Sequence, residues 1–452
     1  MSFSALLKNA DGYALAFKAN DITTAKMRKA IPEWFDMYYQ NEPKNGEDPC
    51  QQIPYTIVRK LTKTIFSEYE ATSKNEYADN ILEALANKSA EAMQLALIGG
   101  ESKLKPIPTG DGFRFLVVPR YNILVFGRDA DGNMTDIGTV ERTAAGNAYY
   151  TLLERRTVDE SGYLTIRNRL FRSYNQENLG QEVPLNSVHA YKALEPEFTF
   201  SKAVGSIGLI SLQTPMTNCV DGSPDCVSVY AAASGLIHNI NRNEAQMSGE
   251  FDRGESRIIV SADMLARKKD GSKALEDHVF VGLDEDQETV GITAFSPALR
   301  EASYLARKQE YLRNVENVIG LKRGLLSEVE AAERTATEIT SSAGEYNLTV
   351  IDFQRMWEKT VKEALRLCGI LGQLYKVPGA HEIPEDAAVI NWGNGVLYDE
   401  EKTWEDYKGM VAAGLLKPEI AMGWRFNMPT KTEADLKKIR DQLMPVAVGE
   451  VE

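Results

Sequence analysis

The hydrophobic positions of the first hundred residues recur at the spacing of an α-helix. From Tyr77 to Ile98 the apolar residues fall every three or four positions, and Gly99-Gly100 follow as a helix end. Upstream, the stretch TTAKMRKAIPEWFDMYY opens with Thr23 and Thr24, which belong to the residue types that cap helix N-termini. The pattern therefore predicts a helical N-terminal region.

The period changes to two between Phe113 and about Phe200. The stretch FRFLVVPRYNILVFGRDADGNMTDIGTV predicts strands joined by a turn at Asp131-Gly132-Asn133. The stretch AYYTLLERRTVDESGYLTIRNRLF predicts a second pair with a turn at Glu160-Ser161-Gly162. Alternation of this kind is typical of antiparallel hairpins, so a β-rich region is expected to follow the helices.

Two helices that flank a compact insert are predicted next. Ser223 is a candidate N-cap for a helix from about Pro224 to Asp252, with Pro224 as its first helical residue. The insert, Arg253–Pro297, contains two stretches with strand character, ESRIIVSADML and DHVFVGL. A second helix is expected from Ala298 to Ile319. Such a pair of helices would act as a stalk that carries a small tip.

The longest apolar stripe begins at about Thr335 and continues to Leu371, with Gly344 as a possible kink. A short strand, AAVINWG, follows this helix. Two terminal helices are predicted around Glu400–Ala413 and Lys431–Leu443, separated by the stretch GLLKPEI. The pattern as a whole predicts an α+β protein. An ordinary α+β protein with long helices explains it as well as a stalked one.

Composition and charge narrow the class of protein. The 452 residues include 51 Lys and Arg against 65 Asp and Glu, a formal net charge of −14. No apolar run approaches the ~18 residues of a membrane span, and Lys8 and Asp11 interrupt any signal-peptide core. Four cysteines give no disulfide framework, so we expect a protein of a reducing cytoplasm. An acidic chain is a poor general binder of nucleic acid, although it can let DNA pass without holding it.

Motifs for enzyme chemistry are absent from the sequence. Neither the GxxxxGK[ST] phosphate loop nor HExxH occurs, and the four histidines are scattered. The stretch Asp129–Asp136 resembles a calcium loop, but Val140 stands where the bidentate Glu should be, so a hairpin turn explains it better. We therefore expect no enzyme, no cofactor and no metal site. A soluble cytosolic enzyme with an unrecognised site stays an alternative.

The order of the parts and three stretches of sequence resemble portal proteins of long-tailed bacteriophages of the siphophage type. The stretches are Gly222–Leu265, Glu333–Leu365 and Asn391–Gly423, and the run Thr-Ala-Thr-Glu at Thr335–Glu338 is the most specific feature. With the matching order of parts, the resemblance extends from about Leu104 to Leu443. A different ring-forming virion protein of the neck or capsid is the nearest alternative.

The resemblance implies a wing, stem, clip and crown in each subunit of a dodecameric ring. The ranges that it implies are 1–220 for the wing, 221–252 and 298–320 for the stem helices, 253–297 for the clip, 321–334 for a tunnel loop, 335–399 for a long wing helix and strand, and 400–452 for the crown. Because the C-terminus is short, a large crown is not expected.

The resemblance also implies a function and partners. A portal forms the channel at the capsid vertex through which double-stranded DNA enters and leaves. It docks the terminase large subunit during packaging and a neck adaptor afterwards, and it contacts the major capsid and scaffold proteins. The protein would be assembled in the bacterial host cytoplasm, would reside in the virion, and would contact no membrane.

Candidate site residues follow from these ranges and from the pattern of charge. Leu326–Glu345 has 5 acidic residues and 1 basic residue, whereas Leu299–Leu325 has 6 basic and 3 acidic residues. Belts of opposite sign would damp sliding of DNA; ion pairs between subunits explain them equally well. The DNA-channel candidates are Lys322, Arg323, Glu328, Glu330, Arg334, Arg307 and Glu310, and the docking candidates are Arg257, Lys268, Lys269, Asp270 and Lys273.

The tunnel loop carries one further expectation. Gly320 and Gly324 bracket its start, so we expect the loop to swing and to follow DNA as it advances. The alternative is that the loop only connects two helices and packs against a neighbouring subunit.

Overall fold

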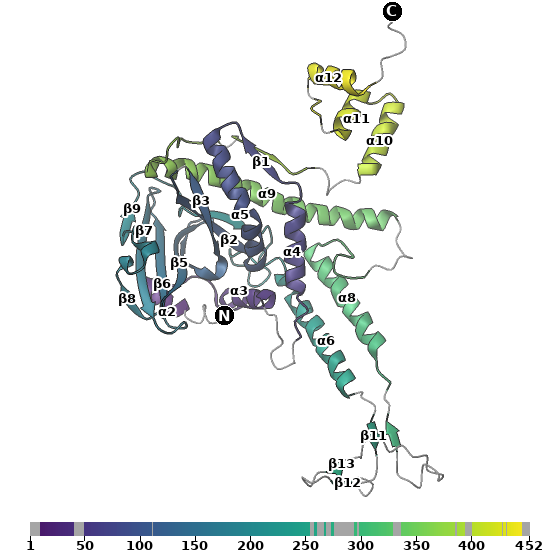
Figure 1. Ribbon diagram of the computed structural model, residues 1–452, viewed down its shortest axis with the longest axis horizontal. Helices are drawn as coiled ribbons and strands as arrows, with labels where there is room; N and C mark the ends of the chain where they lie inside the picture. The colour runs from purple at the N-terminus through teal and green to yellow at the C-terminus, as the bar shows by residue number, and fades with distance from the viewer. Residues whose placement is uncertain are drawn as a thin grey trace, which may run out of the picture.

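The fold is a body of mixed helices and sheets from which two helices project as a stalk (Figure 1). This computed structural model describes residues 10–39, 49–110, 112–253, 257–259, 266–267, 273–274, 293–295, 298–328, 336–384, 387–393, 400–426, 428–430 and 432–444. The stalk leaves one end of the body, and the C-terminal helices lie beyond the opposite end (Figure 1). The expected mixture of helix and sheet is confirmed.

The helical N-terminal region is confirmed. It comprises α2 (Ala10–Phe17), α3 (Ala25–Tyr39), α4 (Ile53–Ile65) and α5 (Glu76–Gly99). Thr24 caps α3, because its hydroxyl accepts the Met27 N–H at 3.2 Å. At the end of α5, Gly100 has a φ of 87°, and a Cβ there would lie 2.4 Å from the Cys226 carbonyl oxygen, so only glycine fits.

The predicted hairpins form a six-stranded antiparallel sheet. Its strands are β4 (Ile123–Arg128), β5 (Met134–Ala145), β6 (Ala148–Val158), β7 (Leu164–Ser173), β8 (Gln181–Val183) and β9 (Glu197–Thr199), with β8 and β9 both paired to β7. Both predicted turns are confirmed, and each has an Asp that accepts two main-chain N–H groups. Asp129 accepts from Asp131 and Asn133, and Asp159 accepts from the corresponding positions of its own turn.

A second sheet of three strands lies between this sheet and the helices. It has the order β10-β2-β3, from β10 (Ile210–Gln213), β2 (Glu101–Pro108) and β3 (Phe113–Pro119). A 3-10 turn, η2 (Arg120–Asn122), leads from β3 into β4 of the larger sheet. The predicted late strand is β15 (Ala388–Asn391), which pairs with β1 (Glu70–Ser73).

The stalk consists of α6 (Ser234–Arg253), which follows the 3-10 turn η5 (Ala231–Ala233), and α8 (Glu301–Ile319). The second stalk helix agrees with its prediction, but the first begins ten residues after Pro224, so Ser223 is not its cap. Residues 224–230 are held in an irregular path instead. Asp225 is buried in ion pairs, and the Val229 N–H donates to the Leu97 carbonyl at 2.9 Å.

The insert between the stalk helices is described only at four short strands. β11 (Arg257–Ile259) pairs with β14 (Thr293–Phe295), and β12 (Ala266–Arg267) pairs with β13 (Lys273–Ala274). β11 lies in the predicted stretch ESRIIVSADML, whereas DHVFVGL lies outside the described residues.

The long predicted helix is α9 (Ala336–Tyr375), which continues through Gly344 without interruption. Its Phe353, Trp357 and Val361 lie in the main core, which α4, α5 and the three-stranded sheet share. The C-terminal part has α10 (Glu400–Ala412), α11 (Pro418–Arg425) and α12 (Glu433–Leu443). The stretch GLLKPEI is therefore not a plain connection, because α11 begins inside it at Pro418 and Glu419 pairs with Arg440 of α12 at 2.6 Å.

Candidate functional site

The loop that follows α8 begins with a sharp turn at Gly320. Gly320 has a φ of 76°, and the Leu321 N–H donates to the Glu316 carbonyl at 2.8 Å. The Thr349 hydroxyl on α9 donates to the Gly320 carbonyl at 3.2 Å, and a Cβ at Gly320 would lie 2.7 Å from that hydroxyl. The turn therefore holds the end of α8 close against α9.

A buried carboxylate organises the first half of this loop. Glu316, in the last turn of α8, is 1% exposed. One oxygen accepts the Gly324 N–H at 3.2 Å and the Ser327 hydroxyl at 2.7 Å. The other accepts the Leu326 N–H and, at 2.9 Å, the Ser327 N–H. Four hydrogen bonds thus compensate for the removal of this charge from water.

Two further side chains hold the same segment. Lys60 of α4 donates to the Leu325 carbonyl, and Gln309 of α8 accepts the Glu328 N–H at 2.8 Å. Residues 321–328, which we call the bracketed segment, are thereby tied to α4 and α8. These hydrogen bonds oppose a swing of residues 321–328 about Gly320 and Gly324, and the expected motion of the loop stays a prediction.

The bracketed segment presents part of the predicted DNA-channel set. Lys322, Arg323 and Glu328 are described, and all three are exposed. Glu330 and Arg334 lie outside the described residues. The structure thus brings three of the five loop residues to the surface beside the end of α8.

The outward face of α8 carries the other two channel candidates. Arg307 is exposed, and its guanidinium donates to the Tyr311 hydroxyl at 3.0 and 2.8 Å while it lies over that ring. Glu310 is exposed and lies 3.8 Å from Arg313. Both side chains therefore interact along their own helix.

Several basic residues of the predicted belt pair within the subunit. Arg300 pairs with Glu250 of α6 at 2.7 Å, and its hydrogen bonds lower the pKa of Glu250 to about 2. Lys308 pairs with Glu244 of α6 at 2.9 Å. These contacts join the two stalk helices. The sequence interpretation considered a belt facing DNA or pairs between subunits, and it missed these pairs within one chain.

The docking candidates are placed only in part. Arg257 lies in β11 and Lys273 in β13, while Lys268, Lys269 and Asp270 lie outside the described residues. Within the described part of the chain, no group of three or more His, Cys, Asp or Glu side chains could hold a metal ion. Among those same residues, no helix is both long and apolar enough to cross a membrane.

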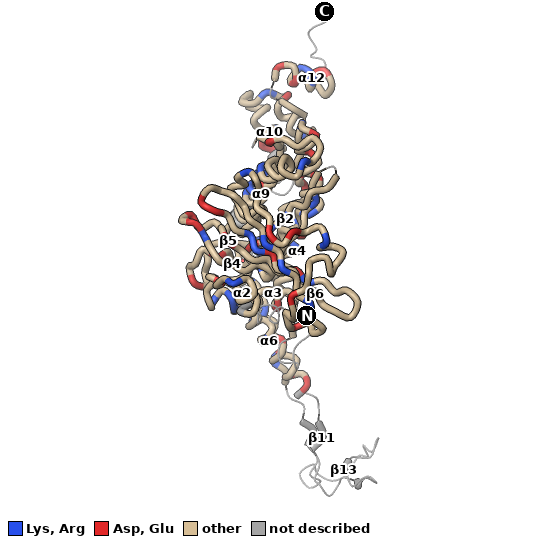
Figure 2. The backbone as a smooth tube through the Cα atoms, turned by 90° about the vertical axis from the view of Figure 1, so that its left-hand side faces the viewer, with Lys and Arg blue, Asp and Glu red and all other residues tan. Residues whose placement is uncertain are grey.

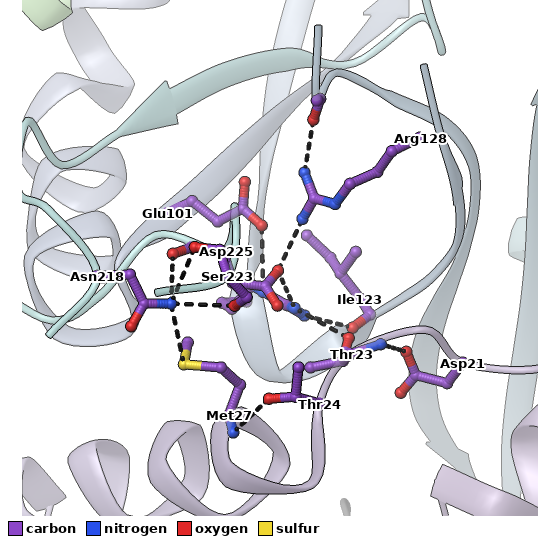
Figure 3. A network of polar contacts seen from close by, with 12 residues as sticks. Asp21, Thr23, Thr24, Met27, Glu101, Ile123, Arg128, Asn218, Ser223 and Asp225 are labelled. Atoms are coloured by element: carbon purple, nitrogen blue, oxygen red, sulfur yellow. Dashed lines mark hydrogen bonds and ion pairs between the residues drawn. The ribbon is translucent and has the colours of Figure 1, made fainter. Parts of the chain in front are cut away.

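A buried ionic network holds the base of the stalk, and no pattern in the sequence indicated it (Figure 3). Asp225 pairs with Arg128 at 2.7 Å and with Arg120 at 3.3 Å. Arg120 also pairs with Glu101 at 3.1 Å, and Lys103 pairs with the same carboxylate at 3.2 Å. Burial alone would raise the pKa of Glu101, but Lys103 and Arg120 outweigh it and hold that pKa below its ordinary value.

This network joins segments that are far apart in the sequence. Glu101 and Lys103 lie in β2, Arg120 in η2, Arg128 in β4, and Asp225 in the irregular path that leads to α6. Asn218 supports the same path by donating to the Asp225 carbonyl at 3.1 Å (Figure 3). The stalk is therefore anchored to both sheets of the body.

Residues 138–444 match the model of a protein family described as "Phage portal protein, SPP1 Gp6-like". The chain belongs to this phage portal family. Portal proteins of this family are structural components of the virion neck rather than a family of enzymes. The resemblance inferred from the sequence is thus confirmed, and the matched region spans β5 to α12, including the stalk and the bracketed segment.

Two solved structures with similar chains are necks of GTA particles. One, described as "Neck of native GTA particle computed with C12 symmetry", has 12% sequence identity and a TM-score of 0.47, covering 93% of this chain and 99% of the other. The second, "Neck of empty GTA particle computed with C6 symmetry", has 10% identity and a TM-score of 0.44, covering 92% and 98%. No curated protein matches.

Proposed function

We propose that copies of this portal chain assemble into a closed ring, taken as a dodecamer, whose central channel conducts double-stranded DNA into and out of the capsid. The observation that carries the proposal is the family match over residues 138–444, which includes the stalk. In this assignment α6 and α8 form the stem, and the insert between them forms the clip. The body before the stalk and α9 form the wing, and the C-terminal helices form a small crown.

Exposed apolar side chains along the stalk support assembly. Phe251 on α6 is 43% exposed, and on α8 Leu305 is 44% and Val318 47% exposed. These side chains are available for contact with neighbouring subunits, because the described part of the chain leaves them exposed. The stems of neighbouring subunits in a ring would cover them.

The pattern of charge fits a channel that does not hold DNA. Figure 2 shows basic and acidic positions interspersed along the body. With a net charge of −14 per chain, twelve copies would carry roughly −170, so the ring as a whole repels the phosphate backbone. Local basic residues such as Lys322 and Arg323 would make brief contacts with phosphates, and Glu328 would keep them weak.

The insert is proposed as the docking site for the terminase large subunit during packaging and for a neck adaptor afterwards. Its described strands, such as β11, lie beyond the ends of α6 and α8 that point away from the body (Figure 1). Electron microscopy of the purified chain tests the ring, and replacement of the insert tests docking.

A further inference from the structure

A cavity of about 500 Å³ lies where the two sheets separate. β3 and β4 are consecutive strands, yet they belong to different sheets, and the chain passes between them through η2. The cavity is lined by β3, by β5 beyond Thr139, and by the ends of α3 and α5. Its lining is mixed: aromatic and apolar side chains include Tyr38, Tyr39, Leu95, Leu116 and Tyr121, and charged side chains are Glu91, Lys105, Glu141 and Arg142.

The main chain of β3 faces this cavity with an unpaired edge. In the pairing with β2, Phe115 lies opposite Pro106, and Phe113 lies opposite Pro108. Because proline has no N–H, these positions cannot exchange both hydrogen bonds of an antiparallel pair. The residues of β3 that lie between these positions therefore form the main-chain hydrogen bonds to β2. Phe113, Phe115 and Val117 direct their N–H and C=O groups away from β2. No described strand pairs with that edge.

β5 has a second unpaired edge at the same cavity. β4 pairs with β5 only as far as Thr139, so among the described residues the rest of β5 has a neighbouring strand on one side only. Ala145 and Ala148 close a two-residue hairpin, and such a pair exchanges both main-chain hydrogen bonds. From this pair onward, every second residue of β5 bonds to β6, and the residues between them point their N–H and C=O groups the other way. Val140, Arg142 and Ala144 consequently direct their main-chain groups away from β6.

The free strand edges and the cavity between them together favour the binding of an extended polypeptide. Unpaired N–H and C=O groups along a strand edge bind another strand, and the aromatic and apolar side chains of the adjoining cavity can take every second side chain of that strand. The volume lies within the roughly 300–1,000 Å³ of typical ligand clefts. The segment that binds here therefore needs a sequence in which apolar residues occupy every second position, so that they lie on one face of the strand.

The first nine residues of this chain have that pattern. They read MSFSALLKN, in which Met1, Phe3, Ala5 and Leu7 alternate with Ser2, Ser4, Leu6 and Lys8, so that Leu6 is the only exception. They lie outside the described residues and directly precede α2. The Tyr13 hydroxyl of α2 accepts a hydrogen bond from Arg142, which also lines the cavity. Nine extended residues span up to ~30 Å, enough to reach along β3 from this point.

We propose that the cavity between β3 and β5 binds the N-terminal segment, residues 1–9, as a strand added to the free edge of β3. The added strand would place Phe3 and Leu7 against the tyrosines and Leu95.

A peptide-binding experiment tests this directly. A chain that lacks residues 2–9 is mixed with a fluorescently labelled peptide of sequence MSFSALLKN, and binding is followed by anisotropy. We expect the truncated chain to bind the peptide and the full chain to bind it at least about tenfold more weakly, because its own segment competes. Leu116→Lys in the truncated chain should also weaken binding about tenfold or more.

Controls fix the interpretation. Leu415 is 80% exposed and far from the cavity in sequence, so Leu415→Lys should leave peptide affinity unchanged. A peptide of the same composition without the alternation should not bind. Absence of binding to the truncated chain, or equal binding by the Leu116→Lys variant, would overturn the proposal.

Hydrogen exchange in the full chain supplies a second measurement that does not need the truncated protein to fold. The amides of Phe115 and Val117 should exchange slowly in the full chain and at least about tenfold faster in a Phe3→Asp variant, because the aspartate loses the apolar contacts that Phe3 makes with the tyrosines and Leu95. Slow exchange in both chains would mean that another segment or a second copy covers the edge. Fast exchange in both would mean that the edge is empty. Either result contradicts the proposal.

Discussion

The carboxylate of Glu316 accepts two hydrogen bonds from Ser327, one from its main-chain N–H at 2.9 Å and one from its hydroxyl at 2.7 Å. This contact joins the last turn of the second stalk helix to a residue eleven positions later, on the far side of a glycine turn. A displacement of the end of α8 would therefore carry the bracketed segment with it. We therefore expect the segment to move with the end of the stalk rather than as a free hinge.

Glu316→Gln should loosen the bracketed segment. The amide keeps one acceptor oxygen but replaces the other with a donor that faces main-chain N–H groups, so we expect the free energy of unfolding to fall by about 1–3 kcal/mol. Trypsin should cleave after the exposed Lys322 and Arg323 several-fold faster. Glu301→Gln, at an exposed position in the first turn of the same helix, serves as the control. Equal cleavage of all three proteins would show that Glu316 does not hold the segment.

The free energy of unfolding should fall at acidic pH because the buried carboxylate of Glu154 becomes protonated. Burial alone would raise the pKa of this carboxyl, but Arg156 at 2.7 Å and Lys105 at 2.6 Å outweigh it and lower the pKa from 4.5 to about 2. Because the folded value lies below the unfolded one, the stabilisation is complete above pH 4.5 and is lost as the pH falls toward 2. The loss from this one group is roughly 3 kcal/mol.

Denaturant unfolding between pH 6 and pH 3 checks this expectation. The wild-type free energy of unfolding should decrease across the lower part of that range, and Glu154→Gln should show a shallower slope. Glu197→Gln, which removes a 57% exposed partner of Arg167, should keep the wild-type slope. An unchanged slope in Glu154→Gln would exclude Glu154 as the source.

Charge reversal in the loop tests its place in the DNA path. Glu328→Lys combined with Glu330→Lys should leave rings intact but slow or stall DNA packaging, because stronger phosphate contacts hold the DNA. The defect should lessen as salt rises. Glu160→Lys, in the exposed β6–β7 turn, adds a like charge away from the stalk and should package normally. Normal packaging by the double variant would leave the loop as a structural connector.

Replacement of the insert Arg253–Pro297 by a short Gly/Ser linker should keep the fold and abolish docking. The stalk helices would stay joined by the pairs Lys308–Glu244 and Arg300–Glu250. Binding of the purified neck adaptor, measured by pull-down, should disappear while the unfolding midpoint of the body changes little. Adaptor binding at the wild-type level, or failure of the variant to fold, would contradict the assignment of the insert as the docking tip.

The sequence predicted the elements whose patterns are long and regular. The stripe of α9 and the turns at Asp131-Gly132 and Ser161-Gly162 are local signals, and the structure confirms them. The start of α6 was predicted ten residues early because the contacts of Asp225 with two arginines of other strands override the local helix signal of Ser223-Pro224. No pattern along the chain shows such a distant partner.

The buried polar contacts were missed for the same reason. In the strand ESKLKPIP the Lys103 side chain has the spacing of an outward position, yet it is 1% exposed because Glu101 and Ser211 accept its hydrogen bonds. Glu316 occupies a helix whose other glutamates are exposed, and only the fold of the following glycine turn brings N–H groups to it. Burial of a charge depends on its partners, and these lie elsewhere in the chain.

Class-averaged electron microscopy of the purified full chain at micromolar concentration and physiological salt tests the central claim most directly. The ring assignment predicts end-on views with cyclic symmetry around a central hole, and side views with a stalk on one side of a wider body. Mass photometry of the same sample should give a particle mass that is a whole-number multiple of the 50.3 kDa chain. Averages that show only compact single subunits, with no ring and no hole, would contradict it.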